Sequence, residues 1–360
     1  MPGLSYERYG LTGNPFRELA TENLEDVAIF HVDQDVDQSL RAIREEVFDK
    51  ENRAVISIIG ELGAGKTERL RVTEAEAKEQ KAFAVYFDVT EKTPAILRGL
   101  AQEIGKAAKE SGLIKTFGGP AWARPMAALE KVKDEKYDAA EAGRTIARAL
   151  NETAPSFLLL NDLHTLIESS EIDAFVKVLQ EVANGIKPGV LVMFSCYTSY
   201  LPWLSVNHPA FAQRINRTFL LTRLKGDEAA LLLAKKMLVK RVVEDLDPTY
   251  PFDSDAVTLL NAAAGGNPRR LLELADVVME YAVAHRAYRV DQDIVQSVLA
   301  ERRSPSTEAL LPGTKPSQPS LAPQVPSNPQ PPQAAPSAPA SRPVSPSKPP
   351  VPTYRESDPQ

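Results

Sequence analysis

A glycine-rich segment that ends in a lysine and a threonine is the part of the sequence best suited to chemistry. It runs from Gly60 to Thr67 and matches the phosphate-binding pattern G-x-x-x-x-G-K-[ST], the P-loop, at every fixed position. The glycines let the chain curl so that successive N–H groups point inward, and the following helix N-terminus adds a partial positive charge. A polyphosphate fits such a cradle. The residues expected to contact a nucleotide are Gly60, Glu61, Leu62, Gly63, Ala64, Gly65, Lys66, Thr67 and Glu68.

This pattern also assigns roles to its last two residues. Lys66 would reach the β- and γ-phosphates of ATP, and the Thr67 hydroxyl would ligate Mg²⁺. The flanking sequence supports the assignment, because residues 54–59 are an apolar, β-branched run and residues 68–81 are rich in helix-forming residues. The motif therefore lies between an expected strand and an expected helix.

A P-loop also needs a carboxylate at the end of a neighbouring strand to hold the metal through water. Residues 157–160 form an apolar run that ends in Asn161 and Asp162, which makes this segment the candidate Walker B strand. Two registers are open. Either Asn161 and Asp162 replace the usual Asp-Glu pair, or Asp162 is the metal-side acid and Leu163 stands where a catalytic acid should be. Both registers lack one charge, so nucleotide binding is expected and hydrolysis is expected to be slow. His164 is more typical of a surface or capping residue.

Strands alternate with helices along the first two thirds of the chain, which indicates a parallel α/β sheet covered on both faces. The alternation stops after Gly226, and four helices are expected from there to Arg303, the first of them spanning residues 227–245. Of the 29 prolines, 17 follow Arg303, and a segment so rich in proline cannot bury a core. The expected organisation is an N-terminal segment, a P-loop α/β domain, a helical lid and a disordered Pro-rich tail, at residues 1–35, 36–225, 226–303 and 304–360. The N-terminal segment either wraps the nucleotide base or only covers the core.

The composition is that of an ordinary globular protein, with 43% hydrophobic and 25% charged residues in a chain of 360. The net charge of −6 argues against binding nucleic acid by bulk charge alone. Cys196 is the single cysteine, which leaves no disulfide framework and favours a reducing compartment. No apolar run reaches the length of a membrane span and the first residues lack a signal-peptide core, so the sequence predicts a cytoplasmic protein.

Taken together, the P-loop, the strand ending in Asn161-Asp162, the helical second domain and the segment Gly265–Arg270 resemble an AAA+ ATPase. The resemblance covers residues 5–303 and is strongest to the branch that holds the origin-recognition initiator ATPases and the transposition-regulator and secretion-type ATPases. In that branch a Tyr/Phe-Gly-Leu and Pro-Phe segment often precedes the nucleotide domain, as residues 9–16 do here. The Walker B strand there often reads Asp-Glu-Val-His, which supports the first register.

The resemblance implies further roles. Arg269 corresponds to the sensor-2 arginine that touches the γ-phosphate from the lid, with Arg270 as the fallback. Ser195 stands where a polar sensor-1 residue is usual. Arg214 corresponds to the arginine finger that one subunit donates to its neighbour, with Arg217 as the alternative. The winged-helix DNA-binding domain that follows the lid in initiator ATPases has no counterpart here, because only the Pro-rich tail remains.

The sequence thus predicts an ATP- and Mg²⁺-dependent switch that forms a homo-oligomer and acts on DNA or a protein. Steps of the form P-x-x-P in the tail suit docking to a protein partner. One rival hypothesis is a nucleotide-gated scaffold that hydrolyses little or no ATP. The other is a P-loop small-molecule kinase, which is disfavoured because kinases lack a four-helix lid with this arginine.

Overall fold

The computed structural model describes residues 6–17, 30–89, 96–110, 138–243 and 246–303. Its centre is a sheet of five parallel strands in the order β2-β3-β4-β1-β5. The strands are β1 (Ala54–Ile59), β2 (Phe83–Asp88), β3 (Ser156–Asn161), β4 (Val190–Cys196) and β5 (Arg217–Leu220). The inner strands are buried on both faces, as their continuous apolar runs require. The expected α/β fold with a parallel sheet is confirmed.

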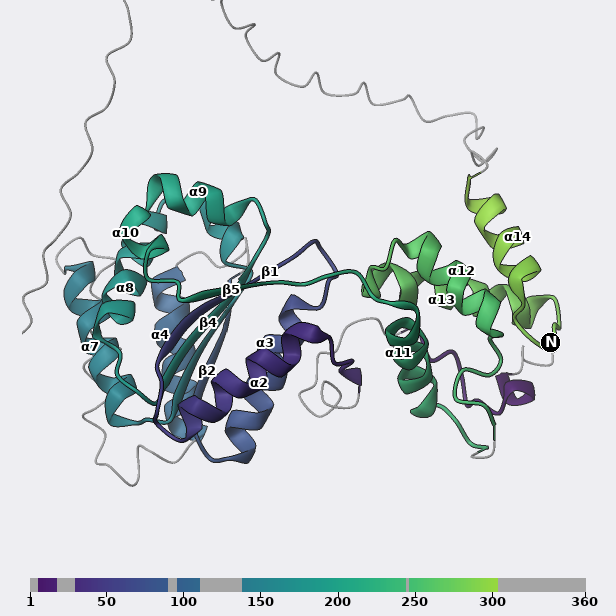
Figure 1. Ribbon diagram of the computed structural model, residues 1–360, viewed down its shortest axis with the longest axis horizontal. Coiled ribbons are helices and arrows are strands. Elements are labelled where there is room, and N and C mark those ends of the chain that lie inside the picture. The colour runs from purple at the N-terminus through teal and green to yellow at the C-terminus, as the bar shows by residue number, and fades with distance from the viewer. Residues whose placement is uncertain (1–5, 18–29, 90–95, 111–137, 244–245, 304–360) are drawn as a thin grey trace, which may run out of the picture. The chain divides into compact units, whose positions relative to one another are not determined.

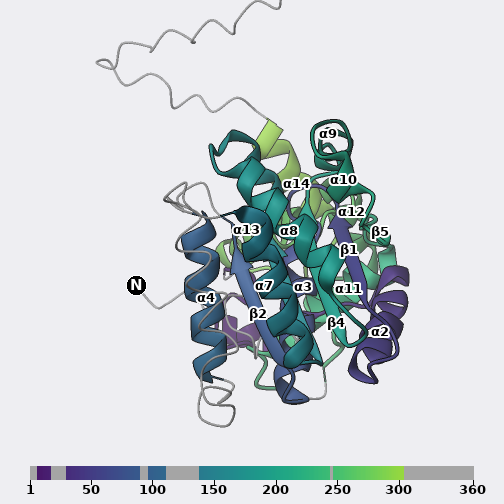
Figure 2. The same cartoon turned by 90° about the vertical axis from the view of Figure 1, so that its left-hand side faces the viewer.

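Helices cover both faces of the sheet. One face packs against α2 (Asp35–Phe48) and α3 (Lys66–Glu79), and the other packs against a larger group of helices (Figure 1). That group is α4 (Ile96–Glu110), α7 (Ala139–Glu152), α8 (Ile172–Gly185), α9 (Tyr200–Asn207) and α10 (Pro209–Ala212). Figure 2 shows α4, α7 and α8 over the sheet from this side. Gly143 lets α7 approach α8 closely, because a Cβ there would lie 2.5 Å from the Val178 carbonyl oxygen.

A second core belongs to four C-terminal helices, called the lid below. They are α11 (Gly226–Leu238), α12 (Ser254–Ala264), α13 (Pro268–Ala284) and α14 (Gln292–Arg303). The N-terminal residues pack on this core: Tyr9 in the short 3₁₀ helix η1 (Tyr6–Tyr9) donates to the Ala287 carbonyl at 2.6 Å, and Phe16 stacks edge-on against Phe252. The lid and residues 6–16 therefore share one apolar interior.

One expected helix has the wrong end, and one helix was not expected. The helix expected over residues 227–245 ends at Leu238, because the chain turns to form a backbone bridge between Leu11 and Arg241. Helix α9 was not expected, although Pro202 lies in its first turn, where proline is tolerated. The Pro-rich tail lies outside the described residues.

Candidate functional site

The P-loop leaves β1 and enters α3 as a closed curl. Gly63 and Gly65 adopt φ angles of +78° and +92°, which side chains rarely tolerate. Lys66 is buried, and its Nζ donates to the carbonyl oxygens of Gly60 at 3.0 Å and Glu61 at 2.8 Å. Burial lowers the pKa of Lys66, and the nearby Asp162 carboxylate opposes this shift. The lysine side chain thus closes the P-loop by bonding to carbonyl oxygens at the loop's start.

Asn161 ends β3 beside the P-loop and joins four side chains. Its Oδ1 accepts hydrogen bonds from Thr67 Oγ1 at 3.1 Å and from Ser195 Oγ at 2.7 Å. Its Nδ2 donates to Asp88 Oδ1 at 2.9 Å and to Asp162 Oδ2 at 3.1 Å. Two hydroxyls on one side and two carboxylates on the other fix the orientation of the amide, because a carboxylate can only accept. Of the two registers left open, the structure brings Asn161 rather than Asp162 against Thr67.

Asp162 follows in a left-handed conformation with φ of 54°, and its backbone N–H donates to Ser195 Oγ at 2.8 Å. Burial raises the pKa of the Asp162 carboxyl, while His164 and Lys66 act in the opposite direction. His164 stacks on the Tyr197 ring with centroids 3.7 Å apart, and burial lowers the pKa of its imidazole. A neutral His164 therefore leaves Lys66 as the principal positive charge beside Asp162.

A cavity of about 370 Å³ opens over the P-loop. Its wall contains P-loop residues 62–68 and Asp162 on one side and mostly apolar side chains of the N-terminal segment and lid on the other. The lining residues of this second side are Phe30, Val32, Gln34, Leu224, which precedes the lid, and Leu232, Lys236, Pro268, Arg269 and Leu272 of the lid; Gln34, Lys236 and Arg269 are polar and the rest are apolar. Lys236 Nζ lies 3.8 Å from the centre of the Phe30 ring. The cavity thus joins a polar phosphate cradle to an apolar compartment large enough for a nucleoside.

The first residues of α13 touch the P-loop directly. Asn267 Nδ2 donates to the Leu62 carbonyl at 2.8 Å, and its Oδ1 caps the helix by accepting from Arg270 N–H at 3.2 Å. The backbone N–H of Arg269 donates a hydrogen bond to the Gly63 carbonyl at 3.4 Å, and the Arg269 guanidinium forms an ion pair with Glu273 at 3.0 Å. The structure therefore brings Arg269 to the cavity wall, while Arg270 lies exposed beyond the cap.

The expected finger arginines lie elsewhere. Arg214 follows α10 and Arg217 begins β5, and both are exposed. Neither lines the cavity described above.

Several charged residues near the loop were missed by the sequence analysis. The ring nitrogens of His31 lie 3.1 Å from Glu68 Oε1 and 3.2 Å from Asp33 Oδ1. Arg69 forms a buried pair with Asp37 at 2.8 Å. No local pattern marks these contacts. Those of His31 with Glu68 and of Arg69 with Asp37 join residues 37 and 32 positions apart in the sequence, and that of His31 with Asp33 lies in an irregular stretch.

The donor set around Thr67 suits Mg²⁺, which prefers oxygen ligands and keeps several waters. A hydroxyl, an amide oxygen and two carboxylates meet here within hydrogen-bond reach of Asn161. In the register that the structure favours, Thr67 would ligate the ion and Asn161 would position its water. Asp162, the metal ligand expected in the other register, accepts a hydrogen bond from Asn161 Nδ2 instead.

Comparisons with known proteins concern the family and the fold. Residues 49–197 match a family described as AAA domain. The Aeropyrum pernix ORC2 protein, solved in ADPNP–ADP complexes, is similar with a TM-score of 0.50 and 16% identity, over 77% of this chain and 71% of that chain. The Aeropyrum pernix ORC1 protein, solved in complex with DNA, is similar with a TM-score of 0.50 and 18% identity, over 79% of this chain and 68% of that chain. At such identities the likeness shows the fold.

No curated protein matches the sequence. None of the described helices is both long enough and apolar enough to cross a membrane.

Proposed function

We propose that this chain, whose residues 49–197 match the AAA domain family, is an AAA+ switch gated by Mg-ATP. The observation that carries the proposal is the contact between lid and P-loop, in which Asn267 donates to the Leu62 carbonyl. Phosphates bound in the loop would lie against the first turn of α13, so nucleotide state would set the lid's position. Arg269 on the cavity wall is the group that would report the γ-phosphate.

We propose that the same site hydrolyses ATP slowly. Asn161 carries no charge, although its amide oxygen lies against Thr67 and can position metal-bound water. The raised pKa of Asp162 favours a carboxyl able to take a proton from an attacking water. Aspartate is one methylene shorter than glutamate, and this shorter reach is the reason for expecting low turnover.

Assembly through an arginine in trans completes the proposal. Arg214 is exposed and does not line the cavity of its own chain, which is what a residue serving a second copy requires. The homo-oligomer would act on DNA or a protein. DNA is the first ligand to test, because the similar ORC1 protein was solved with DNA. Docking through the Pro-rich tail is proposed from its P-x-x-P steps alone.

The alternative function is a nucleotide-gated scaffold that binds ATP, assembles and turns over little. The neutral Asn161 in the metal-side position favours it. The two hypotheses share the same binding site and differ in whether Asp162 can activate water.

Steady-state ATP turnover over a range of protein concentrations, with and without double-stranded DNA, tests the proposal. We expect turnover that rises steeply with concentration and is lost in Lys66→Ala and Asp162→Asn. A wild-type rate equal to that of Lys66→Ala, despite ATP binding, would replace the enzyme with the scaffold.

Mixing two inactive variants tests the arginine in trans. A ring containing Lys66→Ala and Arg214→Ala subunits regains some complete sites, because an intact P-loop can meet an intact finger. We expect the mixture to recover part of the turnover that each variant lacks alone. Arg217→Ala is the matched control: full activity in that variant assigns the role to Arg214, whereas full activity in Arg214→Ala removes it.

A further inference from the structure

Asp88 is a carboxylate at the nucleotide site that the sequence motifs do not mark. It ends β2, and the parallel pairing of β2 with β3 places it in register with Asn161. Asp88 Oδ1 accepts a hydrogen bond from Asn161 Nδ2 at 2.9 Å, while Asn161 Oδ1 accepts from Thr67 Oγ1 at 3.1 Å. A single buried amide therefore links Asp88 to the hydroxyl expected to ligate Mg²⁺.

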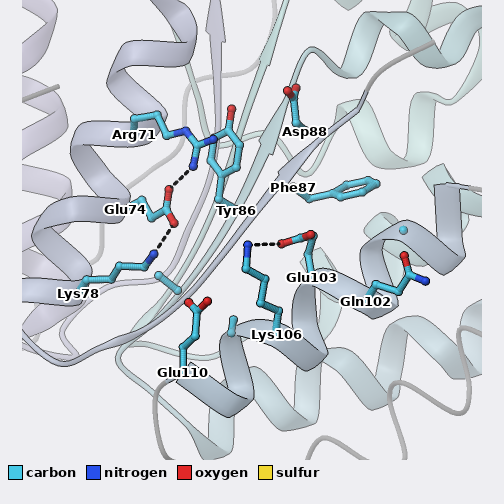
Figure 3. Close-up of a pocket in the computed structure, with 13 residues that line it drawn as sticks. Arg71, Glu74, Lys78, Tyr86, Phe87, Asp88, Gln102, Glu103, Lys106 and Glu110 are labelled. Atoms are coloured by element: carbon cyan, nitrogen blue, oxygen red, sulfur yellow. Dashed lines mark hydrogen bonds and ion pairs between the residues drawn. The ribbon is translucent and has the colours of Figure 1, made fainter. Parts of the chain in front are cut away.

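None of the described cations around Asp88 forms an ion pair with it. Figure 3 shows Asp88 at the rim of a cavity of about 440 Å³ between α3, β2 and α4. The cations of this cavity already have carboxylate partners: Arg71 and Lys78 both pair with Glu74 at 2.8 Å, and Lys106 pairs with Glu103 at 3.8 Å. Arg71 is further held by stacking over the Tyr86 ring at 3.4 Å. In the described structure, the recorded partner of Asp88 is the neutral amide of Asn161.

We propose that Asp88 supplies the negative charge that the Asn161 position lacks. The inference rests on the proposed function, since it concerns the same Mg-nucleotide site. Strand ends of neighbouring strands lie about 4.8 Å apart, so the carboxylate is one strand away from the usual position. At that separation Asp88 acts on metal-bound water and on the Asn161 amide, as a positioning residue. Side chains in this outer shell are worth roughly 10–100-fold in metal affinity.

Asp88 is exposed at the end of β2, and its bond to the buried Asn161 amide is what separates it from other surface carboxylates. Asn161 can donate to Asp88 and accept from Thr67 at the same time, so loss of the Asp88 charge would be felt at the Thr67 hydroxyl. The site thus holds two carboxylates, Asp88 and Asp162, on either side of one amide.

The test is the Mg²⁺ dependence of nucleotide affinity, measured with a fluorescent ATP analogue in Mg²⁺ and in EDTA. We expect Asp88→Asn to bind the analogue as wild type does in EDTA and to lose about tenfold of the gain that Mg²⁺ brings. Glu110→Gln removes another carboxylate from the same cavity and is the matched control, with an unchanged gain. A merely structural role for Asp88 would weaken binding equally in both buffers.

Moving the charge gives the second arm of the experiment. The double variant Asn161→Asp/Asp88→Asn moves the carboxylate from the end of β2 to residue 161 at the end of β3. We expect Mg²⁺ to increase the nucleotide affinity of this variant almost as much as it does for wild type. If Lys66→Ala abolishes binding while Asp88→Asn keeps the full Mg²⁺ gain, the role of Asp88 is refuted and the proposed function stands. If wild type and Lys66→Ala bind the analogue equally, the proposed function and this inference fail together.

Discussion

The buried ion pair behind the P-loop provides the sharpest test of how this fold holds its site. Arg69, in the first turn of α3, pairs with Asp37 of α2 at 2.8 Å, and both side chains are about 95% buried, with exposed fractions of 4% and 5%. Arg69 also donates to Gln34 Oε1 at 2.9 Å and to the Gly65 carbonyl at 3.3 Å. The substitution Arg69→Met keeps most of the aliphatic stem and removes the charge.

The expected loss of unfolding free energy in Arg69→Met depends on the contacts that Asp37 retains. Removing one partner of a buried pair costs about 3–5 kcal/mol, because the other charge is left uncompensated. Asp37 retains a hydrogen bond from Gln34 N–H at 2.8 Å and lies 3.6 Å from His31 Nε2. These contacts place the loss at the lower end, about 3 kcal/mol. The exposed pair of Arg41 with Asp33 at 3.4 Å is the matched control, and Arg41→Met should cost less than about 1 kcal/mol.

Urea unfolding followed by tryptophan fluorescence measures these losses. Both tryptophans, Trp122 and Trp203, precede the lid in the sequence, so the lid contributes no tryptophan to the signal. The double variant Arg69→Met/Asp37→Leu should recover much of the single-variant loss, since no unpaired charge remains. A cost for Arg69→Met as small as that of Arg41→Met would refute the reasoning, and so would a double variant whose loss is the sum of the singles.

Three further predictions concern the site itself. Asp162→Asn should raise the melting temperature at pH 7. Folding raises the pKa of the Asp162 carboxyl, so this carboxyl stabilises the fold fully below pH 3.8, where it is protonated, and the stabilisation is lost as pH rises through the folded pKa. Thermal scans should show the gain shrinking toward pH 4. Cys196 should resist a thiol reagent at pH 8 until urea unfolds the chain, because burial raises the pKa of its thiol to about 12. Gly63→Ala should weaken nucleotide binding by about tenfold or more in the fluorescence titration, because a Cβ would lie 2.6 Å from Arg269 Cβ on a residue with φ of +78°.

A specific result would contradict each of these three predictions. A pH-independent effect of Asp162→Asn would mean that the carboxyl is not desolvated. Rapid labelling of Cys196 in the folded protein would contradict its burial in β4. Gly13→Ala is the control for Gly63→Ala, since a Cβ at Gly13 meets nothing within 4 Å. Equal affinities of the two alanine variants would show that the approach of α13 to the P-loop does not matter for binding.

The parts of this fold that the sequence predicts are those set by local pattern. Strands β1 and β3 follow from their apolar runs, and the P-loop follows from glycine spacing, because positive φ angles demand that residue. The end of α11 was mispredicted because residues 239–243 continue an apolar and basic pattern compatible with helix. What ends the helix is the bridge from Arg241 to Leu11, a contact 230 residues away in sequence that no local pattern encodes.

The site divides in the same way. Asn161 and Asp162 are recognisable because they end a buried strand, and the choice between their registers needs the position of Thr67, 94 residues away. Asp88 also ends a strand, but a strand-end aspartate is common and carries no signal by itself. Its significance appears when the register between β2 and β3 puts it opposite an asparagine.

The contacts over the P-loop suggest how nucleotide and lid are coupled on the proposed function. In the described structure Lys66 Nζ and Asn267 Nδ2 donate to three consecutive carbonyls of the loop, those of Gly60, Glu61 and Leu62. A phosphate that draws Lys66 away would free two of these acceptors beside the residue that anchors the lid. Coupling between binding free energies is reciprocal, so a partner that pulls Asn267 off Leu62 must change nucleotide affinity by the same factor that nucleotide changes the partner's. DNA or protein that binds the lid would therefore reveal itself as a shift in nucleotide affinity, and that shift should disappear in Asn267→Ser, which keeps the helix cap and loses the amide donor.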